Sequence, residues 1–95
     1  MIIVEQDEKT IINFDDVTKI SINSPIGTNN GEFKITAENI LTAEILGYYK
    51  TEERAKEVLQ EIISTYQIVM TKNNRYGKEL DKIEQFNTVY EMPKE

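Results

Sequence analysis

One long amphipathic stretch, residues 51–72, constrains the fold of this chain more than any other part of its sequence. Apolar side chains recur in it at spacings of three and four residues, which is the pattern of a helix with one buried face: Ala55, Val58, Leu59, Ile62, Tyr66, Val69 and Met70. Thr51 is a suitable N-cap, because its hydroxyl can accept a hydrogen bond from a backbone N–H of the first turn. The pattern therefore predicts a helix over residues 51–72. Its apolar stripe packs on the domain's own core or, alternatively, also meets a second subunit.

The residues before this helix predict a series of short strands. Apolar and β-branched residues alternate with polar ones in the segments 2–4, 10–14, 17–23, 32–38 and 40–50. The pair Asn30 and Gly31 is a type I′ hairpin signal. Gly47, where the alternation slips, indicates a bulge or a close backbone approach. We therefore predict an α+β fold, in which an antiparallel meander of about five strands carries the long helix on one face.

The residues after the helix give weaker patterns. Residues 73–78 predict a loop, residues 79–85 a short helix, and residues 88–92 a final strand that Pro93 ends. A chain of 95 residues predicts a single domain, residues 1–95. The core of such a domain is thin, and oligomerisation is a common remedy, so we expect a homo-oligomer.

Composition excludes several classes of function. The chain has no Cys and no His, so zinc–thiolate sites, thiol nucleophiles and the usual general base are absent, and we predict neither an enzyme nor a cofactor. A net charge of −6 opposes broad nucleic-acid binding. It suits a basic protein partner or simply keeps the chain soluble. No apolar run has membrane-spanning length, and the apolar residues 1–4 are too few for a signal peptide, so we expect a cytoplasmic location and no membrane association.

Two acidic groups were weighed as chemical sites. A site for a hard cation would use Asp7, Glu8, Asp15 and Asp16. A catalytic acid–base pair would use Glu38 and Glu44. The first set matches no calcium-loop spacing, and nothing in the sequence fixes the distance within the second. Turn formation and exposed strand carboxylates explain both sets better, so the sequence predicts neither a metal nor a catalytic site.

Aromatic and polar residues give a more specific candidate for a ligand site. They gather before the predicted helix and in the loop after it: Tyr48, Tyr49, Asn73, Asn74, Arg75 and Tyr76. An arginine beside tyrosine and asparagine can bind a phosphate and stack a base, which is the chemistry of a nucleotide pocket. The alternative is that Tyr48 or Tyr49 caps the core while Arg75 is solvated. In an oligomer, such loops can converge from two subunits.

Four stretches of the chain carry a resemblance: MIIVEQD, IINFDDV, LGYYKTEERAKEVLQEI and MPKE. They make the chain similar to a group of small proteins encoded by phages and prophages of Gram-positive bacteria. The resemblance covers about a third of the chain, and the helix segment is its most specific part. It implies a phage or prophage context but no activity, so no functional residue is carried over from it.

Two functions fit these observations. Phages use small acidic proteins against host defence, so the first is a non-enzymatic, counter-defence protein that sequesters a cyclic or other signalling nucleotide. The alternative is a protein–protein inhibitor or adaptor, whose acidic surface binds a host defence protein such as a nuclease. A small enzyme is a third reading, which the absence of His and Cys disfavours.

Overall fold

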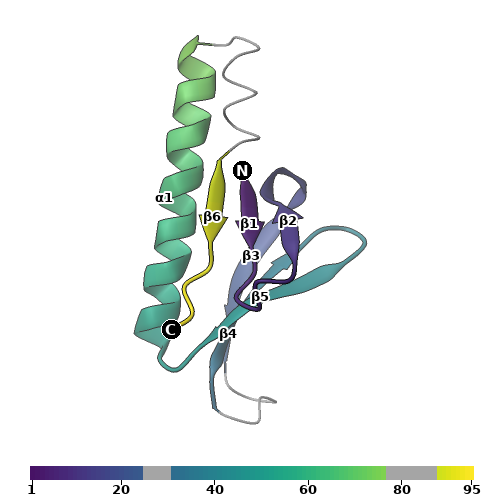
Figure 1. Ribbon diagram of the computed structural model, residues 1–95, viewed down its shortest axis with the longest axis vertical. Helices are drawn as coiled ribbons and strands as arrows, with labels where there is room; N and C mark the ends of the chain where they lie inside the picture. Colours follow the sequence, from purple (N-terminus) through teal and green to yellow (C-terminus); the bar gives the residue numbers. More distant parts are fainter. Residues whose placement is uncertain (25–30, 77–87) are drawn as a thin grey trace.

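The computed structural model of this chain describes residues 1–24, 31–76 and 88–95, with the backbone alone for residues 69–76. Its elements are, in chain order, β1 (Ile2–Val4), β2 (Ile11–Asn13), the 3₁₀ turn η1 (Phe14–Asp16), β3 (Lys19–Asn23), β4 (Phe33–Glu38), β5 (Ala43–Tyr49), α1 (Glu52–Tyr76) and β6 (Val89–Glu91). The predicted α+β class is confirmed, with one long helix along the strands (Figure 1). The predicted helix over residues 79–85 and residue Asn30 of the predicted hairpin turn lie outside the described residues. Gly31 has a φ of 66°.

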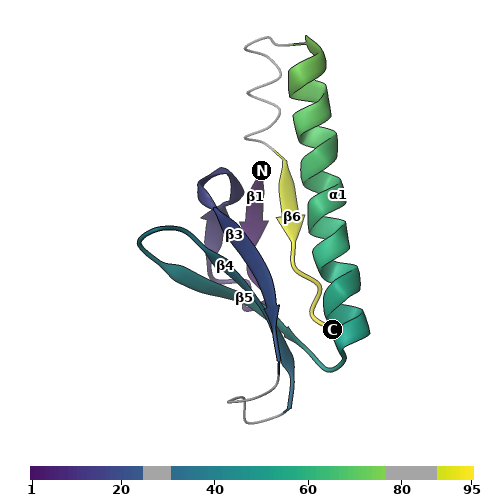
Figure 2. The same cartoon turned by 180° about the vertical axis from the view of Figure 1, so that it is seen from behind.

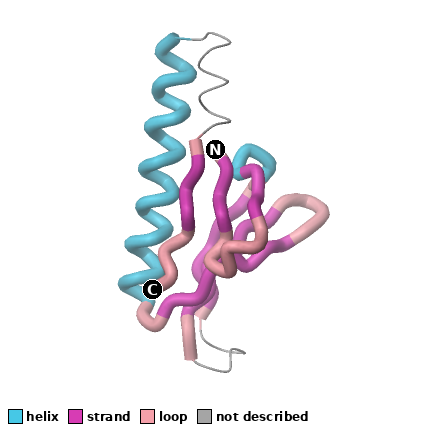
Figure 3. The backbone as a smooth tube through the Cα atoms, viewed as in Figure 1, coloured by secondary structure: helices cyan, strands magenta, loops and turns pink. Residues whose placement is uncertain are grey.

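The described strands form two small sheets, where the sequence predicted one meander. Their strand orders are β2-β1-β6 and β3-β4-β5. The second sheet lies behind β1 in the view of Figure 1 and in front of β1 in the reverse view of Figure 2. The final strand, β6, is parallel to β1, with Ile2 opposite Val89. It lies between β1 and α1 (Figure 3), and the Tyr90 hydroxyl donates to Glu61 of α1 at 2.9 Å. Alternation shows which face of a strand is buried, but it does not identify the strand's partner.

Helix α1 begins where the sequence predicted and ends later. The Thr51 hydroxyl accepts a hydrogen bond from the Arg54 backbone N–H at 3.1 Å, as expected of an N-cap. Residues 73–76, predicted as a loop, are instead the last residues of the helix. Asn73 and Asn74 cost a helix only a fraction of a kcal/mol each, about 0.7 or less. The two asparagines therefore do not end the helix. Glycine is the residue type that most favours a helix end, and the first glycine after them in the sequence is Gly77.

A single core joins the helix to both sheets. Its largest fully buried side chains are Tyr49, Met1, Ile3, Ile35, Leu46, Ile62 and Val58. Helix α1 packs on β3, β4 and β5, and it buries Ala55, Val58 and Ile62. The apolar stripe therefore faces the domain's own core over this part of the helix.

Strand β5 contains the irregularity that Gly47 predicted. Ile35 of β4 is opposite Gly47, but the next residue of β4, Thr36, is opposite Ile45, so Leu46 is an extra residue, or bulge. Gly47 also sits in a tight place, because a Cβ there would lie 3.0 Å from the Tyr49 hydroxyl oxygen. The predicted bulge is confirmed, whereas the groups that approach Gly47 most closely are the side chains of Tyr49 and Gln6 and not another backbone segment.

The Gln6 side chain connects the two sheets and the C-terminal segment. Its Oε1 accepts from the Tyr48 backbone N–H at 2.7 Å and its Nε2 donates to the Tyr48 carbonyl at 2.9 Å, as a neighbouring strand would. The Gln6 backbone N–H donates to the Leu46 carbonyl at 2.8 Å. Nε2 also donates to the carbonyls of Lys94 at 2.9 Å and Pro93 at 3.2 Å. Gln6 therefore binds β5 and the chain after β6 at the same time.

We predict that Gln6→Ala lowers the free energy of unfolding by about 2 kcal/mol, because four hydrogen bonds to the backbone of Tyr48, Pro93 and Lys94 are lost at about 0.5 kcal/mol each, the low value suited to partly exposed groups. Gln6→Glu should cost more than Gln6→Ala, since it places a carboxylate against carbonyl oxygens. Urea denaturation measures both. Gln60→Ala is the matched control, because the Gln60 side chain is exposed and, within the described residues, bonds the Ser64 hydroxyl alone, and it should change stability by less than about 0.5 kcal/mol. A Gln6→Glu protein as stable as the wild type would contradict the connecting role.

Candidate functional site

The residues predicted to form a nucleotide pocket lie near opposite ends of α1. Tyr48 and Tyr49 end β5, shortly before the first residue of the helix, whereas residues 73–76 form its last turn. A helix of 25 residues spans about 37 Å at 1.5 Å per residue. Within one chain, the two halves of the predicted site are therefore not neighbours. The side chains of Asn73, Asn74, Arg75 and Tyr76 lie outside the described part of the structure.

The two tyrosines of β5 have different environments. Tyr49 is 1% exposed, and its hydroxyl donates to the Pro93 carbonyl at 2.6 Å. Burial raises the pKa of Tyr49 to about 12, so its hydroxyl stays protonated and structural. Tyr48 is 40% exposed. Tyr49 is thus the tyrosine that caps the core, and Tyr48 is the one that can meet a ligand.

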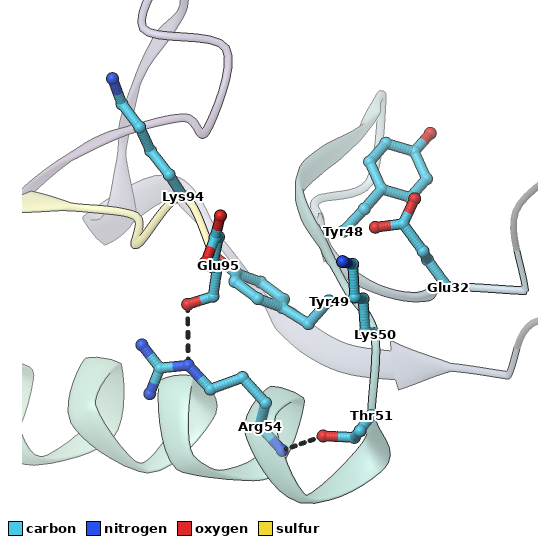
Figure 4. Close-up of a pocket in the computed structure, with 8 residues that line it drawn as sticks. All are labelled: Glu32, Tyr48, Tyr49, Lys50, Thr51, Arg54, Lys94 and Glu95. Atoms are coloured by element: carbon cyan, nitrogen blue, oxygen red, sulfur yellow. Dashed lines mark hydrogen bonds between the residues drawn. The ribbon is translucent and has the colours of Figure 1, made fainter.

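A pocket of about 250 Å³ lies between the end of β5, the start of α1 and the C-terminal residues (Figure 4). It is lined by Glu32, Tyr48, Tyr49, Lys50, Thr51, Arg54, Lys94 and Glu95. Arg54 Nε donates to the Glu95 carbonyl at 2.9 Å, and Lys94 Nζ is 2.9 Å from a Glu8 carboxylate oxygen. Tyr48 and three cations would suit a small aromatic anion, although two glutamates share the wall. The cationic lining residues Lys50, Arg54 and Lys94 did not stand out in the sequence, because they come from three segments.

The β4–β5 hairpin ends in two exposed aliphatic side chains. Ile40 is 93% exposed and Leu41 is 89% exposed. The turn is ordered by Asn39, whose Oδ1 accepts from the backbone N–H groups of Leu41 and Thr42 at 2.8 Å each. Residues 40–42, predicted as part of a strand, form this turn instead, because the Asn39 side chain supplies the hydrogen bonds that a turn needs. The hairpin projects on the side away from α1 (Figures 1 and 2). We call Ile40 and Leu41 the hairpin tip.

A second, acidic pocket of about 180 Å³ lies beside the hairpin tip. It is lined by Ile12, Asn13, Asp16, Val17, Ala37, Glu38, Asn39, Thr42 and Glu44. It brings together Glu38 and Glu44, the pair weighed as catalytic carboxylates. We call it the acidic pocket.

Two of the acidic residues considered for a cation site, Asp7 and Asp15, accept hydrogen bonds from groups of the protein itself. Asp7 Oδ1 accepts from the Lys9 and Thr10 backbone N–H groups at 2.8 and 3.2 Å, and the Lys9 hydrogen bond leads in holding the pKa of Asp7 below its ordinary value. Asp15 accepts from the Tyr66 hydroxyl at 3.0 Å. Among the described residues, no group of three or more acidic, His or Cys side chains is arranged to hold a metal ion.

Glu5 is a buried carboxyl that the sequence analysis did not identify. It is 5% exposed, and its Oε2 has no hydrogen-bond partner in the described structure. Burial first, and then the neighbouring Glu44 carboxylate, raise the pKa of Glu5 to about 7. The sequence did hold a signal for it, since period-two alternation puts Glu5 on the same face as Met1 and Ile3, which are both buried.

Comparison with known proteins identifies no relative of this chain: no protein-family model, curated protein or solved structure matches it. Within the described residues, no helix combines the length and the apolar character that crossing a membrane requires.

We predict that Glu5→Gln flattens the pH dependence of stability. The pKa of Glu5 is about 7 in the folded chain against an ordinary 4.5, so the folded state binds the proton more tightly. This contribution is complete below pH 4.5 and is lost as the pH rises through 7. Its size is on the order of 3 kcal/mol. Glu5→Gln should match the wild type near pH 4.5 and be more stable at pH 8.

Urea denaturation at intervals from pH 4.5 to 8 measures this difference. Glu91→Gln is the matched control, since Glu91 is exposed on β6 and should leave the profile of the wild type unchanged. Parallel profiles for wild type and Glu5→Gln across this range would show that Glu5 keeps an ordinary pKa in the folded chain.

Proposed function

We propose that this chain is a non-enzymatic binding protein that docks onto a second protein through the hairpin tip. The observation that carries the proposal is the near-complete exposure of Ile40 and Leu41 on a turn that Asn39 already holds in place. Burying such a side chain contributes about 1.5–3 kcal/mol. A preformed turn also loses little conformational entropy on binding. The tip is therefore suited to act as an apolar anchor in a cavity of the partner.

The charge around the tip indicates a basic partner. Glu38 and Glu44 flank the tip on β4 and β5, and the whole chain carries a net charge of −6. Complementary charge speeds association and disfavours wrong partners. Proteins that act on nucleic acids present basic surfaces of this kind. The resemblance to phage proteins supports a host defence protein, such as a nuclease, as the partner in the host cytoplasm.

Sequestration of a signalling nucleotide is the second candidate, and the pocket of Figure 4 favours it. The half-exposed Tyr48 ring can stack on a base, while Lys50 and Arg54 can face a phosphate. The volume of about 250 Å³ is below the ~300–1,000 Å³ of most ligand pockets, so it would hold part of a nucleotide. A second copy of the chain would supply the rest, and Arg75 and Tyr76 would contribute only across such a contact.

We predict that the double variant Ile40→Gln/Leu41→Gln loses a protein that the wild-type chain captures from a lysate of its Gram-positive host. The stability of the variant should change by less than about 0.5 kcal/mol, because both side chains are already exposed. Affinity capture followed by mass spectrometry is the measurement. Ile68→Gln is the matched control, since Ile68 is 67% exposed on α1, and it should retain the same protein.

The proposal requires one captured protein that the wild type and Ile68→Gln both retain and that the tip variant loses. Equal capture by all three proteins would show that the tip is not the anchor. Loss by the tip and control variants alike would point to a different surface.

For the nucleotide candidate, we predict that native mass spectra show a multimer with a few hundred daltons of added mass after mixing with cyclic and linear nucleotides. Lys50→Gln should weaken this binding by about tenfold or more, the range of one hydrogen bond to a charged group. Lys56→Gln should not, because Lys56 lies on α1 outside the pocket and pairs with Glu52 at 3.1 Å. Arg75→Ala should also weaken binding if two copies share the site. A bare monomer with every nucleotide would rule this candidate out.

A further inference from the structure

We infer that the acidic pocket receives a lysine or arginine side chain of the partner protein, an inference that rests on the docking of the hairpin tip proposed above. The pocket adjoins the tip, because Glu38, Thr42 and Glu44 of the β4–β5 hairpin form one side of it and the tip residues lie between them in the sequence. The other side of the pocket comes from β2 and η1. A protein that covers the tip therefore meets the pocket as well.

The pocket has negative charge that no described cation offsets. Asp16, Glu38 and Glu44 line it, no lysine or arginine does, and none of these three makes an ion pair within 4.0 Å in the described structure. Lys19 is opposite Glu38 in the β3–β4 pairing, but it neither lines the pocket nor comes within ion-pair distance of Glu38. A cation that enters the pocket would thus meet carboxylates that no described lysine or arginine already pairs with.

The buried Glu5 carboxyl responds to the charge of this pocket. It is 5% exposed, its Oε2 has no donor in the described structure, and its side chain shares a hydrogen bond with Glu44, which lines the pocket. A buried carboxyl that has neither a cation nor a full set of donors keeps its proton. An ammonium or guanidinium group at Glu44 would offset the Glu44 charge that acts on Glu5, and so it would favour the ionised form of Glu5.

The lining of the pocket fits a side chain better than a metal ion. Ile12, Val17 and Ala37 form part of its wall, and these apolar groups can pack on the methylene stem of a lysine or arginine. Calcium needs about six to eight oxygen ligands, yet no group of metal-binding side chains is found in the described residues. The volume of about 180 Å³ equals about six waters at ~30 Å³ each, which is more room than a bare ion needs.

Cation binding should release the proton held by Glu5. The charged groups that act on Glu5 are Glu44 on β5 and Asp7 in the β1–β2 turn, and both favour its protonated form. A bound cation acts in the opposite direction, so it must displace the proton wherever Glu5 is still protonated. Because the pKa of Glu5 is about 7, affinity should rise about tenfold between pH 6 and pH 8.

The test uses Nα-acetyl-arginine amide and the lysine analogue as probes, titrated into the ¹⁵N-labelled full chain and followed by NMR. We expect saturable shifts confined to residues 12–17 and 37–46. Glu44→Gln should weaken binding by tenfold or more, and Glu91→Gln, exposed on β6, should not. The tenfold gain between pH 6 and pH 8 should be present in the wild type and absent in Glu5→Gln.

Three results would overturn the inference: no saturable shift in these segments, equal binding by Glu44→Gln, or tighter binding of Ca²⁺ than of either probe at the same residues. The Ile40→Gln/Leu41→Gln variant separates this test from that of the proposed function. It should bind the arginine probe as the wild type does while losing the partner protein. If the tip variant keeps the partner protein, the docking proposal fails. The probe binding of Glu44→Gln tests only the pocket, because it does not involve the partner protein.

Discussion

The pairing of the Gln6 side chain with the Tyr48 backbone is the contact on which the described architecture depends. The β2-β1-β6 sheet has strands of only three residues, and so small a sheet is marginal without other support. Gln6 attaches it to the longer β5 strand and to the C-terminal segment. The same attachment carries Glu5 into the interior beside Glu44, and it holds Lys94 at the rim of the pocket in Figure 4. The junction therefore helps to form the pocket of Figure 4 and to bury Glu5.

The bulge at Leu46 explains why β5 can accept that junction. In a regular strand, residues 45, 47 and 49 would share one face. The extra residue changes this order, so that Leu46 and Tyr49 are both buried while Ile45 and Tyr48 stay partly exposed. The backbone N–H and carbonyl of Tyr48 bond the side-chain amide of Gln6, which takes the position that a neighbouring strand would occupy. Glycine suits this position because a Cβ there would lie 3.0 Å from the Tyr49 hydroxyl oxygen, which would have to shift to make room.

Local patterns predicted the elements of this fold better than their partners or its sites. The start of α1 and the irregularity at Gly47 depend on neighbouring residues, so the sequence contained them. The parallel pairing of β6 with β1 joins residues at opposite ends of the chain, and no local pattern encodes it. The predicted ligand site assumed a helix that ends before Asn73. Glu5 was overlooked because a carboxylate at the end of a strand normally faces water.

Two costs to stability involve the β4–β5 hairpin, one at its tip and one beside Glu44. Ile40 and Leu41 leave apolar surface in water, and Glu5 keeps a buried oxygen without a partner. Neither cost helps the fold, since the turn is held by Asn39 and the core is complete without the tip. A partner with an apolar cavity and an adjacent lysine or arginine would relieve both at once. One binding event explains the two features more economically than separate accidents of packing would, because the exposed tip and Glu44, the neighbour of Glu5, belong to a single hairpin.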